Sequence, residues 1–111
     1  MWPPYPAIFG DIAEKPEDAE ETRLIEAMEG AHQFPGFYPM VVIAHEGDAF
    51  RALLKATLAL EQGDAPFRIS ERPSRMGTYI SFRVEVFVAS AQVALARKGV
   101  IAALDGVLFI L

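Results

Sequence analysis

The most constraining feature of this sequence is the alternation of residue types in residues 78–88, which read TYISFRVEVFV. Isoleucine, phenylalanine and valine occupy every second position from Ile80 to Val88. The positions between them hold Tyr79, Ser81, Arg83, Glu85 and Phe87. Because successive side chains of a strand point to opposite faces, this pattern predicts a long strand with one face buried and one face open. A sheet with one uncovered face is therefore expected.

Shorter patterns on both sides of this strand predict the rest of the domain. Residues 40–45 and 107–111 are apolar runs of strand character, and residues 66–72 alternate. Apolar residues at helical spacing lie between these runs. One helix should begin with Asp48 as its N-cap and end at Gly63. The other should begin after Ser90 and continue to about Leu104, with Val93, Ala96, Val100 and Leu104 on its buried face.

The predicted order of elements is β-α-β-β-α-β, which is the ferredoxin-like, or split βαβ, arrangement. We therefore expect an α+β fold. Its four-stranded antiparallel sheet should have the strand order 4-1-3-2, with both helices on one face. The two edge strands are then the second and the fourth, and edge strands favour pairing between subunits.

The N-terminal third is predicted to lie outside this domain. Residues 1–15 contain three prolines and a glycine, which favour an extended arm. The arm is either a flexible tail or packs on its own domain or a neighbouring subunit. Residues 16–30 predict a helix with acidic residues in its first turns. We expect two parts, an arm with a helix at 1–33 and a ferredoxin-like domain at 34–111.

Composition excludes several classes of site and partner. The formal net charge is −5, so no diffuse attraction to nucleic acid or to anionic membranes is expected. The absence of cysteine excludes disulfides and thiolate metal sites, and it fits a reducing compartment. Residues 1–21 lack the basic start and apolar run of a signal peptide, and no apolar run is long enough to span a bilayer. We expect a cytoplasmic protein.

Known catalytic and nucleotide-binding motifs are absent from the sequence. It contains neither a phosphate-binding glycine loop nor a nucleophile elbow, and its two histidines lack metal-ligand spacing. An RNA-recognition module shares the predicted topology and stacks bases on aromatic residues of its central strands. Here Tyr79 and Phe87 would serve, but the first strand, at 40–45, offers only aliphatic residues. We expect no metal, no cofactor, no nucleic acid and no enzymatic activity.

Basic residues gather around the connection between the second and third strands. Arginines on one sheet face can hold a carboxylate or phosphate through paired hydrogen bonds. They can equally pair with Glu71, with Glu85 or with the acidic N-terminal helix. If the open face binds a small acidic effector, its residues are predicted to be Arg68, Arg72, Ser74, Arg75, Tyr79, Ser81 and Arg83.

Three strings of residues resemble one family of proteins. They are FPGFYPMVVI at 34–43, R-P-S-x-x-G-x-Y-x-S at 72–81 and GVLFIL at 106–111. Together they resemble the YbeD-like family of small bacterial proteins of unknown function, over about residues 34–111. Two positions depart from the family pattern. Arg75 stands where a second serine is usual, and Val41 stands where lysine is frequent.

The resemblance implies a likeness to ACT regulatory domains, which share the βαββαβ fold. Such domains bind small effectors at interfaces between paired domains. From this likeness we expect a non-enzymatic regulatory or small-ligand-binding module that forms a homodimer. The alternative is a protein-interaction or assembly module that uses the open sheet face or the N-terminal arm. The family carries no established catalytic residues.

Overall fold

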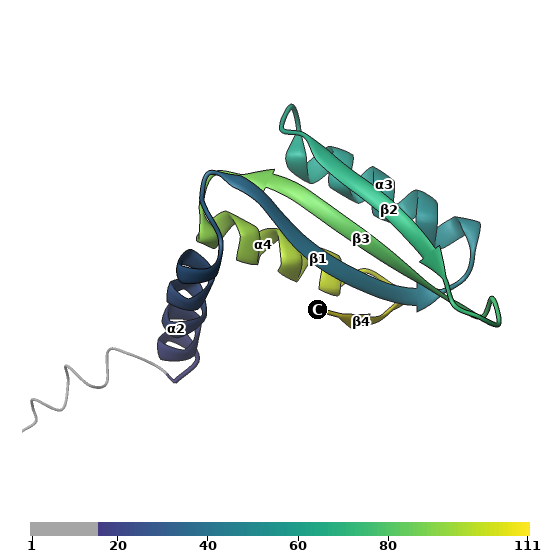
Figure 1. Ribbon diagram of the computed structural model, residues 1–111, viewed down its shortest axis with the longest axis horizontal. Helices are drawn as coiled ribbons and strands as arrows, with labels where there is room; N and C mark the ends of the chain where they lie inside the picture. Colours follow the sequence, from purple (N-terminus) through teal and green to yellow (C-terminus); the bar gives the residue numbers. More distant parts are fainter. Residues whose placement is uncertain (1–15) are drawn as a thin grey trace, which may run out of the picture. The chain divides into compact units, whose positions relative to one another are not determined.

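The structure is a computed structural model that describes residues 16–111, and the predicted arm at 1–15 lies outside the described residues. The chain divides between Ala31 and His32 into two compact units. The first unit contains helix α2, Pro16–Ala31, which extends one residue beyond the predicted end at Gly30 (Figure 1). The boundary predicted between residues 33 and 34 stays a prediction.

The second unit has the predicted ferredoxin-like architecture. Its elements are β1 (Gly36–His45), α3 (Asp48–Gln62), β2 (Phe67–Pro73), β3 (Tyr79–Val88), α4 (Ala91–Ala102) and β4 (Val107–Ile110). The strand order β2-β3-β1-β4 is the predicted order read from the other edge, and every pairing is antiparallel. Helices α3 and α4 lie on the same face of the sheet (Figure 1). The predicted fold class is confirmed.

The core lies between the sheet and these two helices. Every second residue of β3, from Ile80 to Val88, is buried, as the alternation predicted. Phe82 at the centre of β3 is fully buried, and its ring lies 5.7 Å from the Phe50 ring. From α3, Leu54 and Leu58 are fully buried. The open face of the sheet follows from this packing, because the residues between the buried ones point away from the helices.

Strand β1 begins four residues earlier than predicted, at Gly36 rather than at residue 40. Residues 36–39, which precede the predicted start, are therefore part of the strand. Pro39 is compatible with the strand because its nitrogen faces the β4 side, as does the Val41 N–H, which donates to the Leu111 carbonyl. Strand β4 pairs no residue before Val41, so a missing N–H at position 39 removes no ladder hydrogen bond.

Helix α4 buries a different face from the one predicted. Ser90 is its N-cap, as expected, and its hydroxyl accepts a hydrogen bond from the Val93 N–H. The buried residues are Ala91, Ala94 and Ile101, whereas Ala96 is exposed and the helix ends at Ala102. Most of the helix is apolar, so several stripes have helical spacing and the pattern alone does not distinguish them. The alanines on the buried face allow the helix to approach the sheet closely.

A buried glutamine connects the end of α3 to α4 and to the sheet. The Gln62 side-chain amide donates to the carbonyl oxygens of Pro66, at 3.1 Å, and of Phe87, at 2.9 Å. Its side-chain oxygen accepts a hydrogen bond from Arg97 at 2.8 Å. All of its polar atoms therefore have partners, which is required of a side chain that is only 6% exposed.

Candidate functional site

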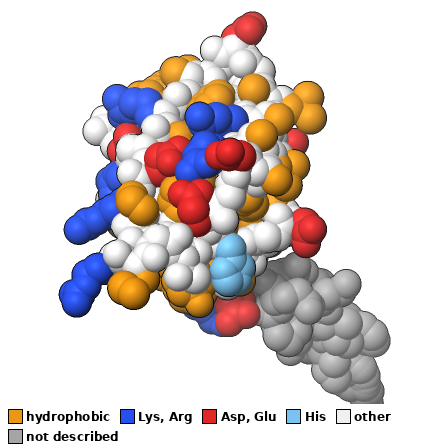
Figure 2. Space-filling model, turned by 90° about the vertical axis from the view of Figure 1, so that its right-hand side faces the viewer, with side chains coloured by type: hydrophobic (Ala, Val, Ile, Leu, Met, Phe, Trp, Pro, Cys, Tyr) orange, Lys and Arg blue, Asp and Glu red, His pale blue; other side chains and the backbone are white. Residues whose placement is uncertain are grey.

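The open face of the sheet is basic at its centre and aromatic at its two ends. Arg68 and Arg72 of β2 and Arg83 of β3 lie on this face with a single carboxylate, that of Glu85. This is a local excess of positive charge in a chain whose formal net charge is −5. Seen from the end of the sheet where β3 begins, basic side chains project along one flank of the molecule (Figure 2).

Strand β1 contributes more to the open face than its predicted aliphatic residues. Because β1 begins at Gly36, Phe37 lies opposite Phe87 in the ladder, and the two rings meet edge to face at 5.4 Å. At the other end of the sheet, His45 lies opposite Tyr79, with 5.1 Å between their rings. The prediction of a purely aliphatic first strand is wrong, since the predicted strand began only at Met40.

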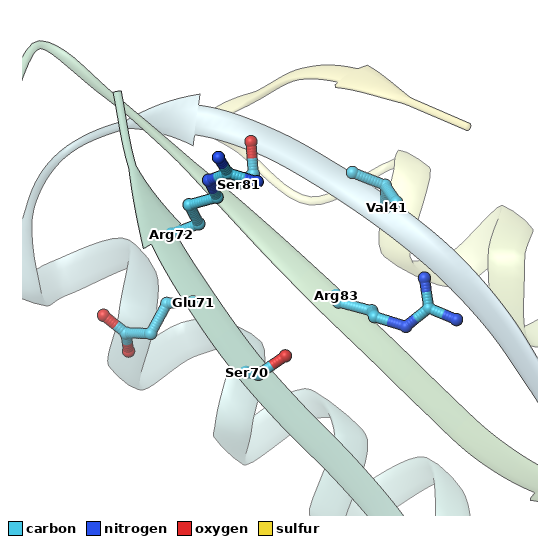
Figure 3. Close-up of a pocket in the computed structure, with 6 residues that line it drawn as sticks. All are labelled: Val41, Ser70, Glu71, Arg72, Ser81 and Arg83. Carbon is cyan, nitrogen blue, oxygen red and sulfur yellow. The ribbon is translucent and has the colours of Figure 1, made fainter. Parts of the chain in front are cut away.

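A pocket of about 320 Å³ occupies the middle of this face. Its lining is drawn in Figure 3 and consists of Val41, Ser70, Glu71, Arg72, Ser81 and Arg83. The Glu71 carboxylate points away from the pocket, toward the helix side of the sheet (Figure 3). The side chains that reach the pocket are therefore two guanidinium groups, two hydroxyls and one aliphatic group.

The two arginines of the pocket are diagonal neighbours across the β2–β3 ladder. Arg72 lies opposite Ser81, and Arg83 lies opposite Ser70. Diagonal positions of an antiparallel pair are about 7–8 Å apart, which is within the combined reach of two arginine side chains. In the structure the Arg83 guanidinium is turned toward Glu85, so a shared ligand would draw it back toward Arg72. Arg72 forms no ion pair with any described residue, and Arg83 has one long contact, 3.7 Å to Glu85.

Hydroxyl groups complete the polar lining of the pocket. The hydroxyls of Ser70 and Ser81 form no hydrogen bond with another residue in the described part of the chain. Hydroxyl donors together with guanidinium groups suit carboxylate or phosphate oxygens. Ser70 was not among the predicted site residues, although its place in the alternation of residues 66–72 put it on the open face.

Arg68 lies on the predicted face but outside the pocket, because its own neighbours hold it. Its guanidinium pairs with Glu85 at 3.1 Å and lies 3.9 Å from the centre of the Phe37 ring. A cation over an aromatic face is attracted by the electrons of the ring. Ligand binding by Arg68 stays a prediction. The ion pair with Glu85 already compensates the charge of Arg68, which makes it a weaker candidate than Arg72.

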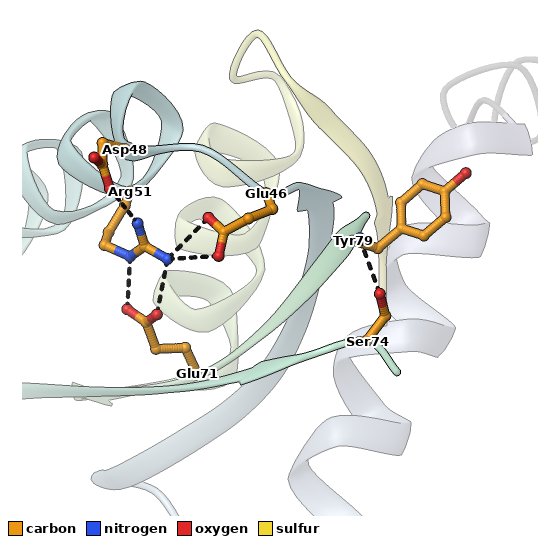
Figure 4. Close-up of polar contacts among 6 residues, drawn as sticks. All are labelled: Glu46, Asp48, Arg51, Glu71, Ser74 and Tyr79. Atoms are coloured by element: carbon orange, nitrogen blue, oxygen red, sulfur yellow. Dashed lines mark hydrogen bonds and ion pairs between the residues drawn. The ribbon is translucent and has the colours of Figure 1, made fainter. Parts of the chain in front are cut away.

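The structure places Ser74 and Arg75 in the hairpin loop that connects β2 to β3. The Ser74 hydroxyl accepts a hydrogen bond from the Tyr79 N–H at 3.0 Å (Figure 4). The backbone N–H of Ser74 donates to the Tyr79 carbonyl. Gly77 supplies the positive φ, 78°, that the turn requires. Arg75 is exposed in this loop and does not line the pocket. Ser74 therefore stabilises the loop.

A cluster of ion pairs that the sequence did not predict joins α3 to β2 and to Glu46, the residue that follows β1. Arg51 of α3 contacts Glu46, Asp48 and Glu71, with shortest distances of 3.1, 2.7 and 2.8 Å (Figure 4). Hydrogen bonds from Arg51 hold the pKa of Glu71 below its usual range, and the same pair raises the pKa of Arg51. Asp48 was predicted as the N-cap of α3. The N-cap is Gly47, and Asp48 lies in the first turn.

This cluster gives an expected dependence of stability on pH. The pKa of Glu71 is lower in the folded state than its ordinary value, so the pair stabilises the fold above that ordinary value. The contribution is lost as the pH falls through the lowered pKa of the folded state. We expect Glu71→Gln to lower the melting temperature by a few degrees at pH 7 and by much less near pH 3. Thermal melts of both proteins at the two pH values would show this, and an equal difference at both would contradict it.

Metal binding and membrane insertion find no support in residues 16–111. No group of three or more histidine, aspartate or glutamate side chains in this range is placed to hold a metal ion. No helix in the same range is long and apolar enough to cross a membrane.

Comparison with known proteins places this domain in a family. The solution structure of protein HP0495 from H. pylori is similar, with a TM-score of 0.62 and 25% sequence identity over 72% of this chain and 85% of that one. No curated protein matches the chain. The family model described as "Protein of unknown function (DUF493)" matches residues 29–111, which confirms the predicted resemblance to YbeD-like proteins. The chain therefore belongs to the DUF493 family of proteins of unknown function.

Proposed function

We propose that this domain binds a small acidic ligand in the pocket of its open sheet face. The observation that carries the proposal is the pair of arginines, Arg72 and Arg83, which flank the same pocket without a close carboxylate partner. Here they lie beside two free hydroxyls, and together these groups match the oxygen atoms of a carboxylate or phosphate.

The proposed role is regulatory rather than catalytic. The pocket is lined by arginine, serine and valine side chains and by Glu71, whose carboxylate is held by Arg51. Neither serine of the lining has a base within hydrogen-bonding distance among the described residues, and an activated serine would need one. A ligand that bridges β2 and β3 would stabilise one arrangement of the sheet and thereby bias a partner that recognises it. We propose a cytoplasmic location, which the cysteine-free sequence supports.

A second candidate function, assembly with another protein or a second copy, is favoured by the β4 edge. Strand β4 and the residue after it expose Leu108, Phe109 and Leu111, at 49%, 55% and 59%. An edge strand with large apolar side chains and no charge is unprotected against pairing with another strand. By contrast the opposite edge, β2, carries Arg68, Glu71 and Arg72. We propose that a homodimer of this chain would form through the β4 edge.

Thermal melts with defined anions test the ligand proposal. Inorganic phosphate, succinate and citrate at millimolar concentrations should raise the melting temperature, because a ligand that binds only the native state stabilises it. Replacing either Arg72 or Arg83 with glutamine should weaken binding about 10–100-fold, since hydrogen bonds to charged groups contribute ~1.5–3 kcal/mol. Sodium chloride at equal ionic strength is the control for screening.

The matched control variant is Arg75→Gln. It makes the same substitution in the loop, outside the pocket, and removes the same charge. Binding should be unchanged in this variant. If Arg75→Gln weakens binding as much as Arg72→Gln does, the effect is one of net charge and the pocket is not the site.

A further inference from the structure

An exposed aromatic pair lies beside the pocket and has no role in the packing of the core. The pair consists of Tyr79 and His45, which are cross-strand neighbours on the open face with 5.1 Å between ring centres. Tyr79 is 44% exposed, and His45 is also exposed. Exposed aromatic rings on a sheet face can stack against the planar ring of a ligand.

The aromatic pair lies at the Arg72 side of the pocket. Along β3, Tyr79 is two residues from Ser81, and Ser81 is opposite Arg72. Residues two apart on a strand point to the same face, at a separation of about 7 Å. A single small molecule can therefore contact the aromatic pair and the pocket at once.

The other side of the pocket ends at a carboxylate. Glu85 is two residues beyond Arg83 on the same face, where it pairs with Arg68 and contacts Arg83. Its negative charge opposes a second phosphate in that direction, and Arg68 already covers the Phe37 ring. Favourable contacts for a ligand are thus confined to one anionic group and one ring.

We infer that the acidic ligand is a mononucleotide, with its phosphate between Arg72 and Arg83 and its base stacked on Tyr79 and His45. This inference rests on the proposed function, because it names the ligand class of the same pocket. The serine hydroxyls of the pocket donate hydrogen bonds to the remaining phosphate oxygens. A longer nucleic acid would place its next phosphate against Glu85, where Arg68 is already paired with that carboxylate, or beyond the aromatic pair, where the described cation is Arg75 of the hairpin loop.

Binding of four probes to the unmodified protein tests the inference. The probes are adenosine 5′-monophosphate, ribose 5-phosphate, adenosine and a single-stranded adenylate tetramer, each titrated by calorimetry. Stacking of a base contributes about 5–150-fold in affinity, so the monophosphate should bind at least about fivefold more tightly than ribose 5-phosphate. Adenosine should bind more weakly than the monophosphate, because it lacks the charge that the arginines recognise.

Two variants locate the base. Tyr79→Val removes the ring and keeps a residue that favours strands. It should reduce the affinity for the monophosphate about fivefold or more and leave the affinity for ribose 5-phosphate unchanged. Phe87→Val is the matched control, since it removes an aromatic ring at the far end of the same strand and face. It should change neither affinity.

The outcomes separate this inference from the proposed function. Equal affinities for the monophosphate and ribose 5-phosphate would overturn the stacked base and leave the acidic-ligand site standing. Equal affinities for adenosine and the monophosphate would overturn the role of the arginines. A tetramer that binds ten times more tightly than the monophosphate would overturn the assignment to a mononucleotide. If neither phosphate compound binds and phosphate, succinate and citrate also fail to shift melting, the proposed function falls as well.

Discussion

Replacing Phe82 with alanine is expected to lower the free energy of unfolding by about 3–5 kcal/mol, the largest effect of any single change considered for this domain. The ring is fully buried at the middle of the central strand β3 and packs beside Phe50. Its removal loses transfer free energy and leaves a cavity that a sheet held by ladders on both sides cannot close. Urea denaturation followed by circular dichroism measures the loss.

Phe87→Ala is the control for this prediction. It deletes the same atoms from the same strand, but on the open face, where Phe87 is 37% exposed. The loss should be less than half of that for Phe82→Ala, because water already covers part of the ring. Equal losses would mean that the open face is packed as tightly as the helix side. The loss of unfolding free energy for Phe82→Leu should lie between the losses for Phe82→Ala and Phe87→Ala. This variant keeps the comparison possible if Phe82→Ala does not fold.

Replacing Gln62 with leucine is expected to destabilise the domain by about 1–3 kcal/mol, although the new side chain is more apolar. The change removes the donor that serves the Pro66 and Phe87 carbonyls and the acceptor that holds Arg97. Polar groups left without partners in a buried site lose their hydration without compensation.

The matched control is Glu61→Leu, at the residue directly before Gln62 in α3. It removes the other partner of Arg97, an ion pair at 3.7 Å between half-buried side chains. That loss should stay below about 1 kcal/mol, as for most surface pairs. If leucine at position 62 is neutral or stabilising, the glutamine network does not hold the helices to the sheet.

The sheet was predictable because its central strand alternates so strictly. In residues 78–88 the period of two requires a covered and an open face, and the same period placed Arg68, Ser70 and Arg72 together on β2. The prediction of the buried face failed for α4, where apolar and polar residues do not separate into two faces. Helix α4 is apolar on most sides, and the stripe that it buries, Ala91, Ala94 and Ile101, is one of several with helical spacing.

The start of β1 was missed because proline is usually excluded from a central strand, and the reason that Pro39 is tolerated lies in a distant strand, β4. Proline disfavours a central strand, and Pro39 stands inside β1. Only the length of β4, which pairs no residue before Val41, shows that this proline faces a side of the strand without a ladder. That information lies about 70 residues away along the sequence, outside any local window.

The candidate site was likewise predictable in part, from the alternation along the strands but not from contacts between distant residues. Which arginines share the open face follows from their order along the strands, because the face of a strand residue depends on its position in the alternation. Which of these arginines lack a carboxylate partner depends on the contacts that the folded chain makes. Pairing of β2 with β3 sets Arg68 beside Glu85 and leaves Arg72 opposite Ser81, and the packing of α3 brings Arg51, rather than a β2 arginine, to Glu71. Such contacts depend on strand register and helix position, which join residues distant in the chain and are set by the fold as a whole.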